Sequence, residues 1–267
     1  MAGKKLQLGE AATAYSNEYD PSLLRPIERS AGRAPLRMRQ FQGYDLWRMY
    51  EMTCLDRSGV PRALCGTLKV DAASPRIIES KSLKLYLLSF TMTKFASKDE
   101  VARVIAHDVG RELKHEVEVQ VFNDEECPFE PEPKAGILID GEAPSGISYS
   151  YNPDFLEADG GMAREDLRSD ILRTLCPVTG QPDHAEVFIS YEGARISHGG
   201  LLAYLISLRT HRGFHEQCCE LIYSDIMTRL KPKSLVVRCA FTRRGGIDIN
   251  PVRTSGPDAA APRTLRQ

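Results

Sequence analysis

The segment Lys84-Leu-Tyr-Leu-Leu-Ser-Phe90 recurs in the second half of the chain as Leu202-Ala-Tyr-Leu-Ile-Ser-Leu208. Apolar residues in both copies return at the three- and four-residue spacing of one helix face, so each copy predicts a buried helix. Chance similarity between two apolar helices would give much of the same match, because helical patterning restricts the residues allowed. The order of the elements around each copy is therefore the stronger sign of a repeat.

Around the first copy, the chain predicts a β-hairpin, two helices and a strand. Two β-rich runs, 47–54 and 63–70, flank a turn that contains Gly59 and Pro61. Downstream of the repeated segment, Ser97-Lys-Asp-Glu100 is a capping-box pattern that announces a second helix. Between residues 117 and 121, valine alternates with Glu and Gln, which predicts a strand with one buried and one wet face.

Around the second copy, the same order is predicted. The runs 171–176 and 185–191 flank a turn-rich connection, and two helices follow. Lys231-Pro232 ends the second of these helices, and 235–241 predicts a strand. The sequence therefore predicts two units of the same kind.

Two irregular stretches separate the units: an acidic, proline-bearing one at 123–134 and a Gly/Pro/Ser-containing one at 141–161. We place the domain boundary near residue 150, which gives domains of residues 1–150 and 151–267. The first 35 or so residues mix charge, proline and small side chains, and we expect an irregular arm on the surface there.

Composition narrows the function. With 42% hydrophobic and 27% charged residues, the 267-residue chain has the make-up of a globular protein. A net charge of -1 offers no broad positive field, so we expect small-molecule ligands and no direct binding of nucleic acid. The chain begins without the apolar core of a secretory signal and has no run long enough to span a membrane, so we expect a cytoplasmic location.

The cysteines predict reduced thiols. Their number is odd, no pair is spaced as CxxC, and no export signal precedes them, so neither a disulfide framework nor a zinc ribbon is expected. The seven residues are Cys54, Cys65, Cys127, Cys176, Cys218, Cys219 and Cys239.

Cys176-Pro-Val-Thr-Gly-Gln-Pro-Asp183 is the first candidate site segment. The turn-rich stretch between Cys176 and Asp183 allows the thiol and the carboxyl to meet. A nucleophilic thiol needs a neighbour that accepts its proton, and a buried carboxyl can take that proton and later donate it. Taken alone, the segment equally describes a structural cysteine in a hairpin with a turn-capping aspartate.

Phe214-His215-Glu216 and Glu79 supply the second constellation. An aromatic face stacks on a planar heterocycle, and a carboxylate accepts the paired N–H donors of a guanine-like edge. Glu216 and Glu79 are the two carboxylates that suit this task, while His215 is a proton carrier beside them. The alternative for each is structural: a helix cap, a surface histidine and a core phenylalanine.

Taken together, Glu79-Ser-Lys-Ser-Leu-Lys-Leu-Tyr86, Cys176 with Asp183, and Phe214-His-Glu-Gln-Cys218 resemble the NADPH-dependent 7-cyano-7-deazaguanine reductases of queuosine biosynthesis, in their long two-domain form. The hairpin and paired-helix units likewise resemble the tunnelling fold. The resemblance implies an α+β chain of two tandem tunnelling-fold domains. Their antiparallel sheets carry helices on one face and assemble into a barrel, in a homodimer that covers the open sheet edges.

The same resemblance implies an activity. Cys176 would attack the nitrile to give a covalent thioimide, Asp183 would protonate the nitrogen, His215 would donate a later proton, and two NADPH molecules would reduce the adduct to the amine without a metal. Implied substrate contacts are Ile78, Glu79, Ser80, Phe214, His215 and Glu216. Implied cofactor contacts are Ser80, Lys81, Arg244 and Gly245. No GxGxxG motif supports a Rossmann site, and Arg243-Arg-Gly-Gly246 is otherwise a solvated basic turn.

Two rival functions stay open. One is a pterin-forming cyclohydrolase with zinc held by His215, Cys218 and Cys219, although adjacent helical cysteines point about 100° apart. The other is a non-catalytic protein that binds a deazapurine or pterin.

Overall fold

A computed structural model describes residues 15–267. In the first half, the predicted hairpin forms β2 (Gln42–Leu55) and β3 (Pro61–Asp71). The predicted helices are α2 (Ser80–Leu88) and α3 (Lys98–Leu113), and the predicted strand is β5 (Val117–Asn123). The Ser97 hydroxyl accepts the Glu100 N–H at the start of α3, as the capping pattern predicts. The predicted order of elements in this half is confirmed.

The N-terminal arm is only partly described. Residues 1–14 of the predicted arm lie outside the described residues. The rest of it contains short elements rather than a wholly irregular chain, namely a 3-10 turn η1 (Pro21–Leu23), β1 (Pro26–Glu28) and α1 (Arg29–Arg33). β1 pairs antiparallel with β4 (Arg76–Ile78), so the arm is fixed directly before α2.

In the second half, the predicted order is also confirmed. The elements are β7 (Ala158–Leu175), β8 (Pro182–Ile196), α4 (His198–Ser207), α5 (His215–Leu230) and β9 (Ser234–Phe241). α5 ends at Lys231, whose φ of 47° places it in the left-handed region directly before Pro232.

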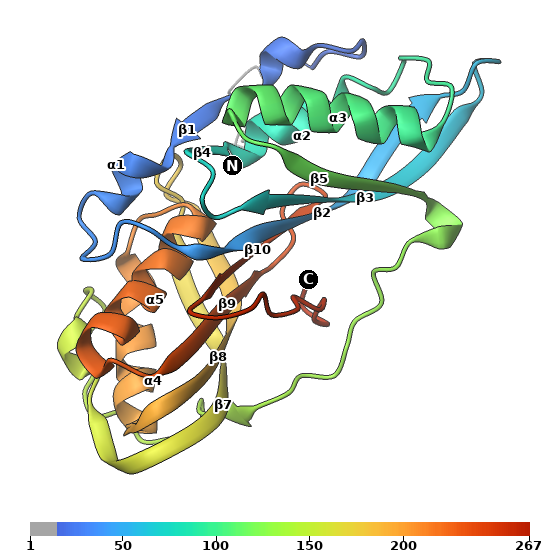
Figure 1. Ribbon diagram of the computed structural model, residues 1–267. Helices are drawn as coiled ribbons and strands as arrows, with labels where there is room; N and C mark the ends of the chain where they lie inside the picture. The colour runs from blue at the N-terminus through green and yellow to red at the C-terminus, as the bar shows by residue number, and fades with distance from the viewer. Residues whose placement is uncertain (1–14) are drawn as a thin grey trace, which may run out of the picture.

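One eight-stranded sheet runs through both halves, in the order β5-β3-β2-β10-β9-β8-β7-β6 (Figure 1). Its strands pair antiparallel, except that the short β6 (Ile137–Leu138) pairs parallel with β7. β10 (Ile247–Thr254) joins the halves, because it pairs with β2 on one side and β9 on the other. The sequence did not predict β10, because the alternation of apolar and polar residues lasts only from Ile247 to Asn250 before Pro251 interrupts it, and all eight residues of the strand are buried.

The helices cover one face of this sheet (Figure 1). α2 and α3 pack over β2, β3 and β5 around Leu68, Leu83 and Ile105, while α4 and α5 pack over β7, β8 and β9 around Val187 and Ile222. The C-terminal tail crosses the opposite face, where Ala261 packs with Val252 and Tyr44. The boundary near residue 150 stays a prediction, as does assembly into a barrel.

A buried ionic cluster ties the arm to the junction of the halves. Arg253 on β10 lies 2.8 Å from Asp45 on β2 and 2.9 Å from Glu220 on α5. Arg29 of α1 bonds Asp45, and Arg33 bonds Glu220. All five side chains are buried, so each charge depends on its partners for solvation.

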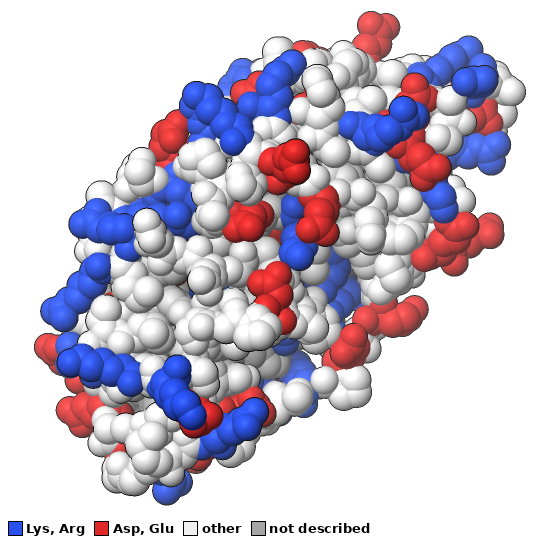
Figure 2. All heavy atoms as spheres, in the orientation of Figure 1, with Lys and Arg blue, Asp and Glu red and all other residues white. Residues whose placement is uncertain are grey.

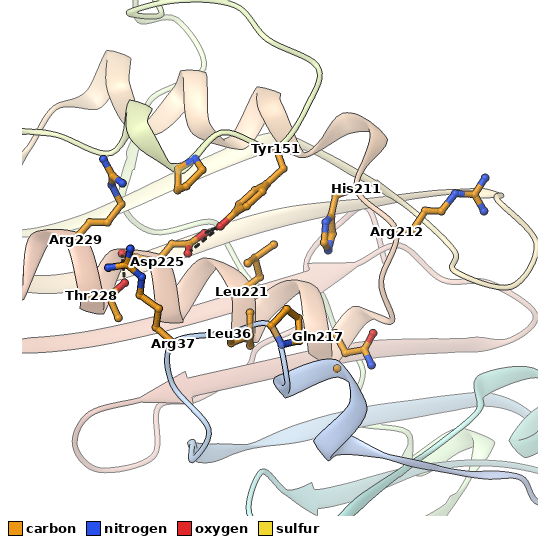
Figure 3. A pocket seen from close by; sticks show the side chains of 13 residues that line it. Leu36, Arg37, Tyr151, His211, Arg212, Gln217, Leu221, Asp225, Thr228 and Arg229 are labelled. Atoms are coloured by element: carbon orange, nitrogen blue, oxygen red, sulfur yellow. Dashed lines mark hydrogen bonds between the residues drawn. The ribbon is translucent and has the colours of Figure 1, made fainter.

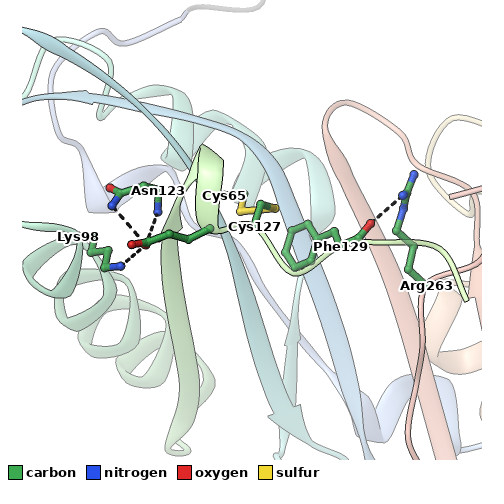
Figure 4. The surroundings of a disulfide bond; sticks show 7 residues. Cys65, Lys98, Asn123, Cys127, Phe129 and Arg263 are labelled. Carbon is green, nitrogen blue, oxygen red and sulfur yellow. Dashed lines mark hydrogen bonds and ion pairs between the residues drawn. A yellow bond between two sulfur atoms is a disulfide. The ribbon is translucent and has the colours of Figure 1, made fainter.

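The cysteine prediction is wrong in one respect. Cys65 on β3 and Cys127, directly after the 3-10 turn η2 (Asp124–Glu126), form a disulfide (Figure 4). They are 62 residues apart in sequence, so no short spacing announced the pair. The bond fixes the chain leaving β5, and Phe129 beyond it accepts a hydrogen bond from Arg263 of the tail. The other five cysteines are free and buried.

Surface charge agrees with the near-neutral composition. Figure 2 shows Lys and Arg interspersed with Asp and Glu over the face in view. Among residues 15–267, no helix combines the length and the apolar character needed to cross a membrane.

Candidate active site

Residues from both halves meet in a pocket beside the β2–β10 junction. The pocket is narrow, with a cavity volume of about 20 Å³. Nine of the predicted site residues line it: Ile78, Glu79, Ser80, Cys176, Asp183, Phe214, His215, Glu216 and Arg244. The two that do not are Lys81, which follows Ser80 in α2, and Gly245, which lines a neighbouring hollow together with Lys84.

Cys176 lies at the start of the tight turn between β7 and β8. Its N–H donates to the Gln181 carbonyl, and its own carbonyl accepts the Gly180 N–H, so the turn closes around the thiol. Burial raises the pKa of the Cys176 thiol, but hydrogen bonds from Thr179, the Val178 backbone and Arg244 oppose burial, and the net pKa is below the ordinary value. These contacts favour a thiolate.

Asp183 returns on β8, opposite Thr174 of β7. Its carboxyl group is only 7% exposed and has two basic side chains as neighbours. Arg244 Nη1 lies 2.8 Å from Oδ1, and His215 Nε2 lies 3.4 Å from Oδ2. Arg244 also lies near the Cys176 thiol and lowers its pKa, so the guanidinium is placed between the predicted nucleophile and the predicted acid.

His215 is the first residue of α5, with Phe214 as the N-cap, as the sequence predicts. Its ring stacks on Phe241 of β9, with centroids 3.8 Å apart and planes 6° from parallel. Stacking fixes the ring plane, and Nε2 faces Asp183. Nδ1 is buried without a hydrogen-bond partner, so this nitrogen is available to a ligand or a water molecule.

Glu216 is the most deeply buried acid of the pocket, at 2% exposed. Its Oε1 has no hydrogen-bond partner, which leaves an acceptor unused. Burial, together with the nearby negative charge of Asp45, raises the pKa of the Glu216 carboxyl to about 8, although Arg29 and Arg253 act in the opposite direction. A buried oxygen without a partner is what a ligand N–H donor would satisfy.

Glu79 also has a structural role, as a helix cap. It is the N-cap of α2, and its two carboxylate oxygens accept the N–H groups of Lys81 and Ser82 at 2.9 and 2.8 Å. Each carboxylate oxygen has a second lone pair, so the cap does not exclude a ligand contact. The helix-cap alternative is thus present together with the predicted position beside the pocket.

Arg244 precedes a two-residue turn that fits close approach by a phosphate-bearing cofactor. Gly245 and Gly246 have φ angles of 64° and 77°, and Arg244 and Ile247 exchange backbone hydrogen bonds across them. Positive φ at both central residues is typical of a type I′ hairpin, for which Gly-Gly is well suited. With the Ser80 hydroxyl beside it in the pocket lining, the Arg244 guanidinium suits the anionic groups of NADPH.

The sequence missed several lining residues. Trp47 on β2 and Ile249 on β10 lie directly opposite each other in the strand register, and both line the pocket. Pro177 and Gly213 complete the lining. Trp47 is the single tryptophan of the chain and lies on a strand before the Glu79 segment. This was the one sequence signal that could have identified it as a pocket residue.

The zinc rival finds no support in this geometry. The Cys219 thiol points to the carbonyls of Val237 and Pro251 in the core, and His215 is directed to Asp183. Within residues 15–267, no group of three or more His, Cys, Asp and Glu side chains is placed to hold a metal ion.

A second, wider pocket lies on the other side of α5 (Figure 3). Tyr151 donates to Asp225 there, and the Tyr204 hydroxyl donates to the same carboxylate at 2.6 Å. In Figure 3, Arg212 extends away from this group. None of the predicted site residues lines this pocket.

Comparison with known proteins supports the family resemblance that the pocket residues carry. Residues 15–121 match the family model described as the N-terminal part of the nitrile reductase 7-cyano-7-deazaguanine-reductase, and residues 182–259 match the model of QueF-like proteins. The NADPH-dependent 7-cyano-7-deazaguanine reductases of Burkholderia multivorans, Burkholderia vietnamiensis and Burkholderia pseudomallei are each 44% identical, over 96% of this chain and 96% of their own. Among solved structures, the archaeosine synthase QueF-Like in its apo form covers 37% of this chain and 97% of its own at 19% identity, with a TM-score of 0.32. This chain therefore belongs to the 7-cyano-7-deazaguanine reductase family.

Proposed function

We propose that this protein is an NADPH-dependent 7-cyano-7-deazaguanine reductase, which converts the nitrile to 7-aminomethyl-7-deazaguanine for queuosine biosynthesis. The observation that carries the proposal is the pocket itself. It gathers Cys176, Asp183, His215 and Glu216 with the start of α2, from both halves of the chain. The relatives that bear this name are 44% identical to this chain over 96% of their length.

Cys176 is the nucleophile of the proposed first step. Its sulfur bonds the nitrile carbon, one C–N π bond breaks, and the proton that leaves the thiol reaches the nitrogen through Asp183. The product is a thioimide, and no electron is gained or lost in the addition. The hydrogen bonds that lower the pKa of the Cys176 thiol support this role.

Reduction of the thioimide needs four electrons. NADPH, which Ser80, Lys81, Arg244 and Gly245 would hold, would supply them as two hydrides from two molecules in turn. Once the first hydride has been added to the thioimide carbon, the C–S bond can break to leave an imine, and the second hydride would reduce the imine to the amine. Cys176 then leaves as a thiolate held by Thr179 and Arg244. His215 is placed to supply a proton, because its Nε2 faces Asp183 and its Nδ1 has no partner.

The proposed substrate contacts follow the shape of the pocket. Phe214, Ile78 and Trp47 offer apolar surface to a flat ring. Glu216, with Glu79 and Ser80 nearby, accepts the ring N–H donors. The unpartnered Oε1 of Glu216 is the main support for this clamp.

The proposed cofactor contacts are Ser80, Lys81, Arg244 and Gly245. The cationic side chains of Lys81 and Arg244 favour phosphate oxygens, and Gly245 adds no side chain that would block them. The support lies in these residue types and in the position of Ser80 and Arg244 in the pocket lining.

We further propose two tunnelling-fold units that complete a barrel in a homodimer. Within the described chain β5 pairs only with β3, so its outer edge of seven residues has no neighbour, and a second copy would cover it. We also propose a cytoplasmic location, which the five free cysteines support. The Cys65–Cys127 disulfide is the feature that is more typical of an oxidising compartment.

The test is an intact-protein mass spectrum after mixing with 7-cyano-7-deazaguanine, without NADPH. We expect a mass gain equal to the whole nitrile, its loss when NADPH is added, and no gain with Cys176→Ala. Demonstrable binding without an adduct would overturn the covalent mechanism. If Cys176→Ala also retained the biological function, the protein would be a non-catalytic binder.

A further inference from the structure

Arg244 occupies a place that a cofactor contact alone does not explain. Its Nη1 lies 2.8 Å from Asp183 Oδ1, and its side chain lines the same pocket as the Cys176 thiol, whose pKa it lowers. Asp183 is 7% exposed and Arg244 is 34% exposed, so the guanidinium reaches from the pocket rim to a buried acid. It therefore contacts both groups of the proposed thiol addition.

The backbone of Arg244 is held firmly while its side chain remains long and partly exposed. The turn requires glycine at both central positions, because a Cβ on Gly246 would lie 2.6 Å from Glu51 Oε2 and one on Gly245 would lie 2.9 Å from Lys84 Cδ. The Arg244 side chain extends from this turn to the buried Asp183.

Arg244 is also the only guanidinium that lines the pocket among the described residues. The titratable groups that face Cys176 and Asp183 are Glu79 at the start of α2, His215 and Glu216 at the start of α5, Cys218 further along α5, and Arg244 itself. Three of these are carboxylic or thiol groups whose charged forms oppose a thiolate. Arg244 is accordingly the main fixed positive charge beside the nucleophile.

We propose that Arg244 is a positioning residue for the thiol addition, which it assists before any cofactor binds, and that a cofactor phosphate later competes with Asp183 for the same guanidinium. The inference rests on the proposed function. In the first state, Arg244 holds Cys176 and Asp183 in place and favours the thiolate. In the second, the guanidinium binds the cofactor phosphate, and Asp183 keeps its contact with His215 Nε2.

The test separates this role from cofactor binding by leaving NADPH out. The rate of adduct formation with 7-cyano-7-deazaguanine is measured by quenched-flow mass spectrometry for the native chain, Arg244→Ala and Arg244→Lys. We expect Arg244→Ala to be about tenfold slower at pH 7, as for the loss of a charge-assisted hydrogen bond, with partial recovery in Arg244→Lys. Arg243→Ala is the matched control, because Arg243 stacks on Tyr50 and does not line the pocket.

A second readout needs no substrate. Alkylation of Cys176 by iodoacetamide, followed across pH, reports the thiolate fraction. Arg244→Ala should shift the profile to higher pH, Arg244→Lys should shift it less, and Arg243→Ala should leave it in place. An Arg244→Ala variant with native adduct rate and alkylation profile, altered only in its Michaelis constant for NADPH, would overturn the inference. A native chain that forms no adduct would instead contradict the proposed function.

Discussion

Substrate binding should release a proton from Glu216. The pKa of this carboxyl is raised to about 8 by burial and by Asp45, so at pH 7 only about one molecule in ten carries the ionised form. A guanine-like edge that donates two N–H groups needs the carboxylate, since a protonated carboxyl has one oxygen occupied by its own hydrogen. The dissociation constant should therefore rise about tenfold for each pH unit below 8.

The assay is isothermal titration calorimetry with 7-cyano-7-deazaguanine between pH 6 and pH 9. Cys176→Ala serves as the background, because it removes the covalent step. Repeating the titration at pH 7 in buffers of different ionisation enthalpy gives the number of protons released, for which we expect about 0.9. Between pH 6 and pH 9, affinity should increase about 100-fold.

Glu216→Gln in the same background is the control. It should bind weakly at every pH and release no proton, because the amide does not titrate. A pH-independent affinity in Cys176→Ala, or a pH dependence that survives Glu216→Gln, would refute the reasoning and assign the titration to another group.

Three further predictions concern stability, each measured by urea unfolding. Cys127→Ser opens a loop of 62 residues and should lower the free energy of unfolding by about 2–4 kcal/mol. A reductant acting on the native chain should have the same effect. No change in either experiment would mean that the disulfide contributes nothing to stability. Glu220→Ala should lower the free energy of unfolding by about 3–5 kcal/mol, because the buried Arg253 loses a charged partner. The control Glu192→Ala, at an exposed ion pair, should change it by less than about 1 kcal/mol. Equal effects of the two variants would contradict the argument. For Glu216, folding raises the pKa from 4.5 to about 8, so stability is lost as pH rises through this window, and Glu216→Gln should exceed the native chain in stability at pH 8 but not at pH 4.

Elements with local signals were predictable from the sequence. The Ser97 cap, the turn around Gly59 and the Lys231-Pro232 stop each act within a few residues, and each is present in the structure. The site residues were predictable for a different reason. Their motifs resemble a known family, and the pocket brings nine of them together.

Contacts between distant residues were not predictable. In β10, the alternation from Ile247 to Asn250 is too short to predict a strand before Pro251 interrupts it, so neither the strand nor its register with β2 was visible. The Cys65–Cys127 bond and the contact between Arg244 and Asp183 join segments 62 and 61 residues apart. Such pairs depend on how the sheet closes, and a single sequence carries no local pattern for them.

The position of β10 also determines how late in synthesis the sheet can be completed. Asn250 on β10 bonds the carbonyl of Leu46 on β2, 204 residues earlier in the chain. At ordinary rates of synthesis, β2 waits on the order of 10 to 40 s on the ribosome before its partner exists. During that interval one edge of the hairpin is open to other chains. Because Arg244 and Ile249 belong to the same late segment, the pocket is complete only after residue 249 has been made, and a product truncated before residue 244 would hold the thiol without its guanidinium.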